Sequence, residues 1–386
     1  MEWVAECFRV CLECARRHGV WLIYESHWAV ASIESHMADS VRRARQAFET
    51  GQPAQPGPLA VQLGGNMVAF ARELLLVMYK RMVQIRDFEL AATNLFKRGQ
   101  LKGAATTYIG MEASAVGVCM ALRPDDLIVS NHRGHGHTLA KGADLRRMAA
   151  ELLGKETGYC KGRGGSMHIS AFETGSLGAL PVVCAGLPIG VGAALAFKMR
   201  GEPRVVVPFV GDGATNTGNF HESLNMASIW DLPLVLVVEN NQFAVSTRVT
   251  EAARVADLSI RAQAYGIPGV RVDGFDVVAV YQAAAEAVER ARSGGGPTLL
   301  VTESYRFDGH YAGEPEVYRD KAEVAAQRAN DPIARFRRHL EDAGIFSPSE
   351  LDAVDAEVSE EIEEALAFAK ASPEPDPATA MDYIYA

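Results

Sequence analysis

Two polar side chains follow two apolar stretches of the chain, each at the point where the stretch ends. Asp212 stands in Gly-Asp-Gly directly after the apolar residues 205–210, and Asn241 follows the apolar residues 232–238. Carboxylate and amide oxygens are hard ligands that suit Mg²⁺, which rarely has an all-protein cage and takes phosphate oxygens to complete its octahedron. The glycines on both sides of Asp212 let the backbone approach such a phosphate closely. These residue types predict that Asp212 holds a metal ion and that the metal ion holds a diphosphate.

The elements around these two residues must bring them together. We expect a strand over residues 204–210, a helix over residues 217–229 and a second, parallel strand over residues 232–238, joined by a right-handed crossover. Carboxyl ends of parallel strands meet at one edge of the sheet, where open α/β folds bind ligands. Gly-Asp-Gly alone is also an ordinary turn. The Asn-Asn pair at the end of the next strand favours the metal site.

Composition limits the class of protein. The chain has 386 residues, of which 48% are hydrophobic and 22% charged, as in a globular enzyme. Its net charge of −10 argues against a nucleic-acid partner, because neutralising phosphates needs a basic surface. No apolar run has the length of a membrane span, and the N-terminus lacks a secretory signal pattern. Six cysteines in a chain of this length indicate reduced thiols and a cytoplasmic protein.

The order of the predicted elements indicates an α/β fold with a doubly wound parallel sheet. The stretches DDLIVSN, RVVVPFV, LPLVLVV and PTLLVTES are nearly all apolar, as expected for strands covered on both faces. Pro208 is awkward in such a strand because it removes a ladder hydrogen bond. Residues 1–66 are predicted to be a helical extension of unknown role that contains a Pro/Gly linker. Residues 67–386 form the main domain, with a core over about 74–340 and a helical, acidic C-terminal tail.

Several motifs resemble one known family. GDGATNTG, followed by FHESLNMASIWDLPLVLVVENN, is similar to the thiamine diphosphate signature, in which Asn-Asn follows Gly-Asp-Gly. HRGHGHTLAKGADLRRMAAELLG, TGYCKGRGGSMHIS and SYRFDGHYAGEPEVYR resemble the alpha subunit of 2-oxoacid dehydrogenases, and the bacterial acetoin/pyruvate branch fits best. The resemblance runs from about Leu74 to the helix after Asp331. It implies a thiamine diphosphate-binding fold with Mg²⁺ as the second cofactor.

The resemblance assigns cofactor contacts to the residues around the first motif. Asp212 and Asn241 would bind Mg²⁺ through their side chains, and Phe243 would bind it through its backbone carbonyl. The backbone amides of Gly213 and Ala214 would donate hydrogen bonds to the diphosphate. The metal site predicted from residue types therefore matches the one that the family implies.

Further assignments fall on a histidine-rich loop and on a loop near the C-terminus. Arg133 of HRGHG and His310 of DGHYAG would contact the diphosphate, since a guanidinium fork and an imidazole are good phosphate donors. His132 and His135 would lie close to the cofactor, and we expect catalytic roles for His132, His135 and His310. The alternative is that Arg133 and its neighbouring histidines form a solvated basic loop, and that His310 is simply exposed.

The chain departs from the family pattern on the substrate side. Pro181 and Val183 of GALPVVCAGLP occupy positions whose backbone meets the aminopyrimidine ring in the family. Proline retains a carbonyl there but lacks a backbone donor, and Cys184 replaces a glycine. Thr106 stands where the family usually has a histidine that contacts reaction intermediates. Asp308 stands where a basic or imidazole residue is common, which puts a negative charge near the diphosphate loop.

The implied chemistry belongs to the cofactor, while the protein supplies placement and electrostatics. The thiazolium carbon adds to the keto group of a small 2-oxoacid, carbon dioxide leaves, and the acyl or aldehyde unit passes to a lipoyl group on an acyltransferase partner. Acetoin-type members act on a hydroxyketone instead. The glutamate that activates the aminopyrimidine is not evident in this chain, and in the family it belongs to a beta subunit. The expected assembly is therefore an α2β2 heterotetramer.

The N-terminal segment carries a rival motif. Cys7, Cys11 and Cys14 have a spacing used by iron–sulfur radical enzymes, and His18 continues the series on one face of a helix. Nothing after the motif predicts the barrel that normally accompanies it. Packing of small apolar cysteines is the favoured interpretation, and metal binding is the alternative.

Three functional hypotheses follow from the sequence. The first is a thiamine-dependent dehydrogenase alpha subunit that works with a beta chain. The second is an alpha-type chain recruited to a different carboligation or ketone substrate, which the changes at Thr106 and Pro181 would fit. The third is a catalytically idle subunit that holds the cofactor and regulates or scaffolds a complex. We favour the first.

Overall fold

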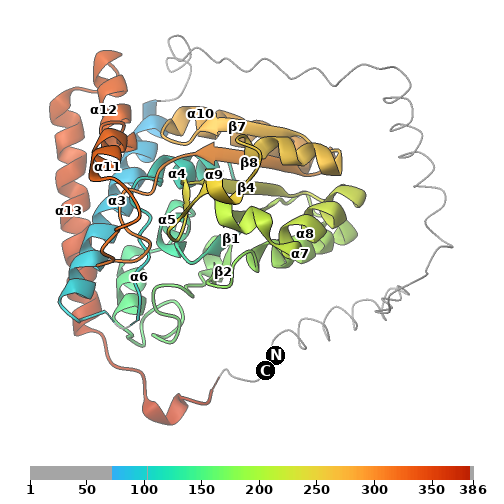
Figure 1. The fold of residues 1–386 in the computed structure, drawn as a ribbon. Helices are drawn as coiled ribbons and strands as arrows, with labels where there is room; N and C mark the ends of the chain where they lie inside the picture. Colours follow the sequence, from blue (N-terminus) through green and yellow to red (C-terminus); the bar gives the residue numbers. More distant parts are fainter. Residues whose placement is uncertain (1–71, 102, 383–386) are drawn as a thin grey trace, which may run out of the picture. The chain divides into compact units, whose positions relative to one another are not determined.

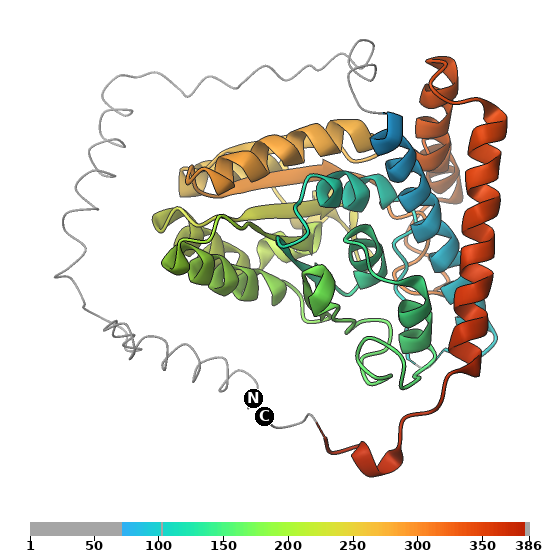
Figure 2. The ribbon, with the colours of Figure 1, turned by 180° about the vertical axis from the view of Figure 1, so that it is seen from behind.

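The described part of the chain is built around one sheet with helices on both faces (Figures 1 and 2). The computed structural model describes residues 72–101 and 103–382. The predicted extension over residues 1–66, its boundary, and the Cys7, Cys11, Cys14 and His18 cluster lie outside these residues, so they stay predictions.

The central sheet has six strands in the order β2-β1-β3-β4-β8-β7, and every pair of neighbours is parallel. Its strands are β1 (Leu127–Asn131), β2 (Ser176–Leu180), β3 (Val206–Gly211), β4 (Val235–Asn240), β7 (Gly269–Asp273) and β8 (Thr298–Glu303). A short antiparallel pair, β5 (Phe243–Ala244) and β6 (Thr247–Arg248), follows β4. The doubly wound parallel sheet predicted from the sequence is confirmed.

The apolar stretches of the sequence predict β1, β3, β4 and β8, whereas β2 and β7 lack that signal. β2 reads Ser-Leu-Gly-Ala-Leu, and its glycine interrupts the apolar run. β2 and β7 are the two edge strands, and the residues of β7 alternate between exposed and half-buried positions. Neither strand is covered fully on both faces, so neither needs the apolar composition that identifies the other four.

Two sets of helices cover the two faces of the sheet. The helices are α3 (Arg72–Lys97), α4 (Glu112–Met120), α5 (Gly134–Ala140), α6 (Leu145–Leu152), α7 (Gly186–Arg200), α8 (Gly218–Ile229), α9 (Val249–Ala252), α10 (Val277–Arg292), α11 (Lys321–Arg328), α12 (Pro332–Asp342) and α13 (Pro348–Ala371). Short 3₁₀ turns are η2 (Phe172–Thr174), η3 (Asp212–Asn216), η4 (Leu258–Tyr265) and η5 (Pro377–Thr379). Helices α3, α4, α10 and α13 lie on one side of the sheet, and α7 and α8 lie on the other (Figure 1).

Alternate residues of the central strands enter different cores. In β4, Val235 and Val237 pack into the core shared with α3, α4 and α10. Leu236 and Val238 pack into the core shared with α7 and α8. Because successive side chains of a strand point to opposite faces, a strand covered on both sides is apolar at every position. The two-sided burial explains the continuous apolar run before Asn241.

Pro208 lies in the central strand β3, where the sequence analysis identifies a proline as unfavourable. It pairs with Val129 of β1. On the other side of β3, an isolated bridge joins Val206 to Leu234, and regular pairing with β4 begins only at Phe209. The ladder between β3 and β4 is therefore interrupted where proline has no N–H to donate. The sheet tolerates Pro208 at this break.

The C-terminal tail is helical, as predicted, and α13 lies beside α3 and α6 (Figure 2). Ser347 begins α13 with a capping box, in which its side chain accepts from the Glu350 amide and Glu350 accepts from the Ser347 amide. Across the contact, the Tyr79 hydroxyl donates to Asp355 at 2.9 Å and Gln84 donates to Glu361 at 2.6 Å. The tail thus completes the outer layer of the α3 side of the sheet.

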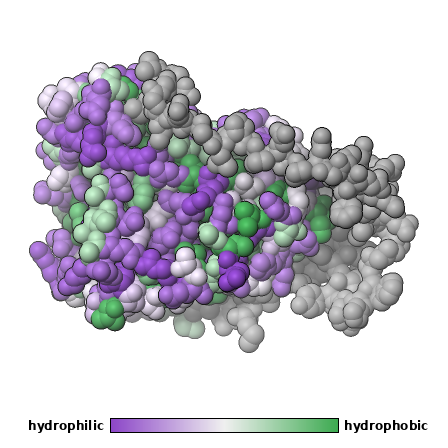
Figure 3. All heavy atoms as spheres, turned by 45° about the horizontal axis from the view of Figure 1, so that its top comes forward, coloured by the Kyte–Doolittle hydropathy of each residue, from purple (hydrophilic) through white to green (hydrophobic). Residues whose placement is uncertain are grey.

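The face shown in Figure 3 carries mostly hydrophilic side chains, with apolar side chains in smaller groups between them. Among the described residues, no helix is both long and apolar enough to cross a membrane.

Candidate active site

A cavity of about 340 Å³ lies where β1, β3 and β4 end. The residues that the sequence singles out and that line this cavity are His132, Arg133, Pro181, Val183, Asp212, Gly213, Ala214, Asn241, Phe243 and His310. They come from loops that are far apart in the chain. Parallel pairing of β1 with β3 and of β3 with β4 brings these loops to one edge of the sheet.

The oxygen donors of the predicted metal site lie at the ends of two adjacent strands. Asp212 begins the η3 turn directly after β3, and Asn241 follows β4, which pairs with β3. Both side chains are almost fully buried. The amide of Asn241 donates to the sulfur of Met111 at 3.4 Å, and its oxygen accepts from the Phe243 amide at 3.3 Å. Each carbonyl-type oxygen has two lone pairs, so Asn241 retains one for a metal ion.

Burial disfavours the negative charge of Asp212 unless a cation lies beside the carboxylate. Burial raises the pKa of Asp212 to about 6, against the lowering effect of its own amide, the Gly213 amide, Arg306 and Arg133. Within the described part of the chain, no cluster of three or more His, Cys, Asp or Glu side chains is arranged to hold a metal. A site with one carboxylate, one amide oxygen and one carbonyl would not form such a cluster. That donor set fits Mg²⁺ that takes its remaining ligands from phosphate and water.

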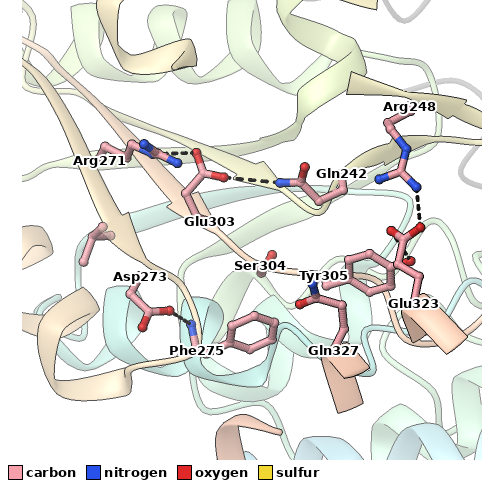
Figure 4. Close-up of a pocket in the computed structure, with 11 residues that line it drawn as sticks. Gln242, Arg248, Arg271, Asp273, Phe275, Glu303, Ser304, Tyr305, Glu323 and Gln327 are labelled. Carbon is pink, nitrogen blue, oxygen red and sulfur yellow. Dashed lines mark hydrogen bonds and ion pairs between the residues drawn. The ribbon is translucent and has the colours of Figure 1, made fainter. Parts of the chain in front are cut away.

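The backbone between the two strand-end donors adopts a left-handed conformation. Gln242 has φ of +75°, which is uncommon for a residue with a side chain. Its side-chain amide donates to Glu303 of β8 at 3.3 Å (Figure 4). The same amide donates to the backbone carbonyl of Asn240, also at 3.3 Å. These bonds hold the turn that carries the chain from Asn241 to Phe243.

Two glycines keep the loop after β3 open. A Cβ atom on Gly213 would lie 2.5 Å from the Cβ of Ala244, so only glycine fits there. A Cβ atom on Gly211 would meet no atom within 4 Å, and Gly211 lines the cavity. A side chain at Gly211 would therefore take up cavity space. Both observations fit a loop that a phosphate approaches closely.

A cationic group, made up of Arg133, His132 and His310, also lines the cavity. Arg133 is buried directly before α5, and its Nη1 donates to the Thr107 carbonyl at 2.6 Å. Its Nη2 lies 3.2 Å from both the carbonyl oxygen and Nδ1 of His310. The His132 and His310 rings are 5.3 Å apart between centroids. The structure thus brings together Arg133 and His310, which the sequence assigns to the diphosphate, and His132, which the sequence expects close to the cofactor.

The electrostatics of this group favour an anion. Burial and the neighbouring guanidinium of Arg133 lower the pKa of His132 to about 2 and that of His310 to about 4. Burial and the charge of Arg306 lower the pKa of Arg133 to about 10. The pKa values of all three side chains are lowered because their surroundings disfavour additional positive charge. The negative charge of a diphosphate would favour positive charge on these side chains. The residues present therefore fit the anionic half of the expected cofactor.

Arg306 lies beside this site, and the sequence argument did not single it out, although it stands in the motif SYRFDGH. It is buried, and its Nη1 donates to the Phe243 carbonyl at 3.2 Å while its Nη2 donates to the Val245 carbonyl at 2.8 Å. The Phe243 carbonyl has a second lone pair for a metal ion. A buried arginine beside two carbonyls and a cavity adds positive charge that no local pattern predicts.

His135 lies outside this cavity. Its Nδ1 is 2.9 Å from Glu89 and its Nε2 is 3.0 Å from the hydroxyl of Ser166, and the ring is fully buried against Phe88. The structure therefore does not bring His135 together with His132 and His310.

The structure shows the surroundings of three substrate-side departures, Thr106, Cys184 and Asp308. The Thr106 hydroxyl, on the cavity wall, donates to the carbonyl of His132. Cys184 has φ of +64°, where glycine is the natural residue. Asp308 does not line the cavity, and its carboxylate pairs with Arg328 at 2.6 Å. Its negative charge is therefore compensated away from the proposed diphosphate region.

A second cleft, of about 470 Å³, lies beyond the ends of β7 and β8 (Figure 4). Its charged residues are already paired, Arg271 with Glu303 at 3.0 Å and Arg248 with Glu323. None of the predicted site residues lines it. The smaller cavity is thus the candidate active site.

A parallel sheet with a carboxylate, an amide and a cationic group at adjacent strand ends is typical of α/β enzymes that bind phosphorylated cofactors. Comparison with known proteins narrows this class. The family described as "Dehydrogenase E1 component" matches residues 80–378. The chain belongs to this family.

Named relatives are alpha subunits. The alpha subunit of acetoin:2,6-dichlorophenolindophenol oxidoreductase from Cupriavidus necator is 45% identical over 315 residues, which cover 81% of this chain and 95% of that protein. The subunit of the same name from Bacillus subtilis is 45% identical over 82% of this chain and 95% of its own length. The alpha subunit of the pyruvate dehydrogenase E1 component from Rhizobium meliloti is 42% identical over 81% of this chain and 90% of its own length.

Proposed function

We propose that the chain is the alpha subunit of a thiamine diphosphate-dependent dehydrogenase that decarboxylates a small 2-oxoacid or cleaves acetoin. The observation that carries the proposal is the single cavity that Asp212 and Asn241 share with Arg133 and His310. Oxygen donors for a metal ion and cationic donors for a diphosphate meet there. The names of the relatives support both substrate classes.

The residues of the cavity divide into a metal half and a phosphate half. In the proposed complex, Asp212, Asn241 and the Phe243 carbonyl hold Mg²⁺, and the amides of Gly213 and Ala214 donate to the diphosphate. These donors fit because burial disfavours an uncompensated charge on Asp212 and the loop leaves room at Gly211. When bound, the cofactor supplies a thiazolium carbon that acts as the nucleophile.

The remaining residues of the cavity orient the cofactor and neutralise the charge of its diphosphate. Arg133 and His310 donate to the diphosphate, and His132 lies beside them as an uncharged imidazole. The backbones of Pro181 and Val183 border the aminopyrimidine end of the cavity. His135 is left out of the contact set, because its two ring nitrogens are engaged by Glu89 and Ser166.

The proposal includes a beta subunit. Asp212 is the only carboxylate among the described residues that line the cavity, and we assign it to the metal ion. In this scheme the glutamate that the family uses to activate the aminopyrimidine comes from another chain. We propose an α2β2 heterotetramer in the cytoplasm that passes its product to the lipoyl group of an acyltransferase partner.

Native mass spectrometry of the tagged chain purified from its own host tests this proposal. We expect a complex of two alpha and two beta chains that carries thiamine diphosphate and Mg²⁺. Turnover with pyruvate, 2-oxobutyrate, branched 2-oxoacids and acetoin then identifies the substrate. A homo-oligomer without a second chain, or a heterotetramer that binds no thiamine diphosphate, would contradict the proposal.

A further inference from the structure

The buried carboxylate of Glu239 does not line the cavity, but it forms hydrogen bonds to several of the segments that build the cavity wall. Glu239 lies on β4, is 1% exposed, and is absent from the cavity lining. Its carboxylate accepts hydrogen bonds from the Tyr108 hydroxyl, from Nε2 of His137 at 3.0 Å and from the side-chain amide of Asn131 at 3.3 Å. The three donors satisfy the hydrogen-bonding needs of a carboxylate that has no access to water.

The donors belong to the segments that carry the proposed cofactor contacts. Asn131 directly precedes His132 and Arg133, and its side-chain oxygen accepts from the backbone amide of Arg133 at 2.8 Å. His137 lies one helical turn after Arg133 in α5. Glu239 itself lies two residues before Asn241 on β4. Through Asn131, the Glu239 carboxylate therefore connects two parts of the site. One is β4, which ends next to the metal half, and the other is the backbone of Arg133 in the phosphate half.

The tautomer of His137 follows from the same contact. Because Nε2 faces the Glu239 carboxylate, it carries the proton, and Nδ1 accepts from the Ser130 hydroxyl at 2.7 Å. The ring is fully buried and stacks on Phe209 of β3, with centroids 4.0 Å apart. His137 thus joins α5, β1, β3 and β4 at the point where the cavity begins.

A second buried carboxylate repeats the arrangement on α3. Glu89 accepts from the backbone amide of Tyr108 and faces Nδ1 of His135, both at 2.9 Å. Tyr108 thereby bridges the two carboxylates, with its amide on Glu89 and its hydroxyl on Glu239. Both carboxylates act on Arg133 as opposite charges and oppose the effect of burial on it. The two glutamates are therefore buried counter-charges to the cationic group of the cavity.

We infer that Glu239 is a positioning residue for the cofactor site. Through Asn131 and His137 it fixes Arg133 relative to Asn241, so that the metal half and the phosphate half of the cavity form one rigid unit. The inference rests on the proposed function, because it concerns the same cavity. Glu239 makes no contact with the cofactor in this scheme, and its effect on affinity is carried by the orientation of other side chains.

The test compares Glu239→Gln with Glu112→Gln by titration calorimetry on the full chain, together with its beta partner where one is present. Glutamine at 239 keeps the shape but loses the charge and cannot accept from all three donors. Glu112 is an equally buried glutamate whose carboxylate binds Arg86 at 2.6 Å, away from the cavity. The probes are thiamine diphosphate with Mg²⁺ and, separately, inorganic diphosphate with Mg²⁺, which tests the metal and phosphate halves alone. Unfolding temperatures without ligand accompany each titration.

We expect Glu239→Gln to weaken binding of both probes by about 10–100-fold, the effect typical of residues that orient metal ligands. Glu112→Gln is expected to lower the unfolding temperature without changing either affinity. In an Asn131→Ala background, the effect of Glu239→Gln should shrink, because both changes break the same connection. If Glu239→Gln does not fold, Tyr108→Phe removes one donor and should weaken both probes by a smaller factor.

The failure of the inference differs from the failure of the proposed function. Equal affinities of the Glu239→Gln protein and the unmodified protein for inorganic diphosphate would overturn the inference and leave the proposed function standing. Additive effects of the Asn131 and Glu239 changes would also overturn it. An unmodified protein that binds neither probe would reject the proposed function itself.

Discussion

Nη2 of Arg133 lies 3.2 Å from Nδ1 of His310, although 177 residues separate them in the chain. The guanidinium is always charged and only donates, so the imidazole nitrogen that faces it is the unprotonated acceptor. The pair therefore carries one positive charge. An anion in the cavity would favour a second charge on the imidazole, which gives the site a measurable dependence on pH.

His310 should take up a proton when Mg²⁺-thiamine diphosphate binds at pH 5.5. The pKa of His310 lies at about 4 before binding, so its ring is neutral there, and an adjacent diphosphate raises this pKa. Asp212, whose pKa is raised to about 6, releases a proton when it binds Mg²⁺, so the uptake by His310 is read as the difference in net proton exchange between the unmodified protein and His310→Gln. Calorimetry in buffers with different ionisation enthalpies measures the uptake. His310→Gln should reduce it, and equal uptake by the two proteins would exclude His310 as its source.

Asp212→Ala should abolish Mg²⁺-dependent binding of thiamine diphosphate, because the only charged ligand proposed for the metal ion is lost. Calorimetry with and without Mg²⁺ measures the effect. Asp308→Asn is the matched control, since Asp308 pairs with Arg328 and does not line the cavity. The control should retain its affinity. Binding that survives in the Asp212→Ala protein would reject the metal assignment.

Cys184→Gly should be more stable than Cys184→Ala by about 1 kcal/mol. Both changes remove the thiol, but only glycine adopts φ of +64° without a steric cost. Chemical denaturation of the two variants measures the difference. An alanine variant as stable as the glycine variant would show that the backbone moves out of the left-handed region at no cost.

Two glycines of α7 should respond in opposite ways to alanine. A Cβ atom at Gly190 would lie 2.5 Å from Cγ of Pro208, whose ring cannot move aside easily, so Gly190→Ala should destabilise the protein by about 1–3 kcal/mol. A Cβ atom at Gly192 would meet nothing within 4 Å, and Gly192→Ala should stabilise by up to about 1 kcal/mol through helix propensity. Thermal and denaturant unfolding report both changes. Similar effects at the two positions would contradict the packing of α7 on β3.

The sequence by itself determined the strands β1, β3, β4 and β8 and one edge of the cavity. The continuous apolar runs before Asp212 and Asn241 specify strands buried on both faces, and parallel pairing then puts the two side chains at one edge. This inference needs only neighbouring residues and one crossover. The family motifs add Arg133 and His310 as residues of the same site, and the structure brings both to the cavity.

Tertiary structure alone decided which polar side chains face the cavity and which support it from behind. His132 and His135 stand in the same short motif, yet one lines the cavity and the other is held between Glu89 and Ser166. Likewise, Glu239 precedes Asn241 by two residues but faces Tyr108, His137 and Asn131. Spacing along the chain gives the direction of a side chain within its own element. Its partners depend on the elements packed against it, and those come from distant parts of the chain.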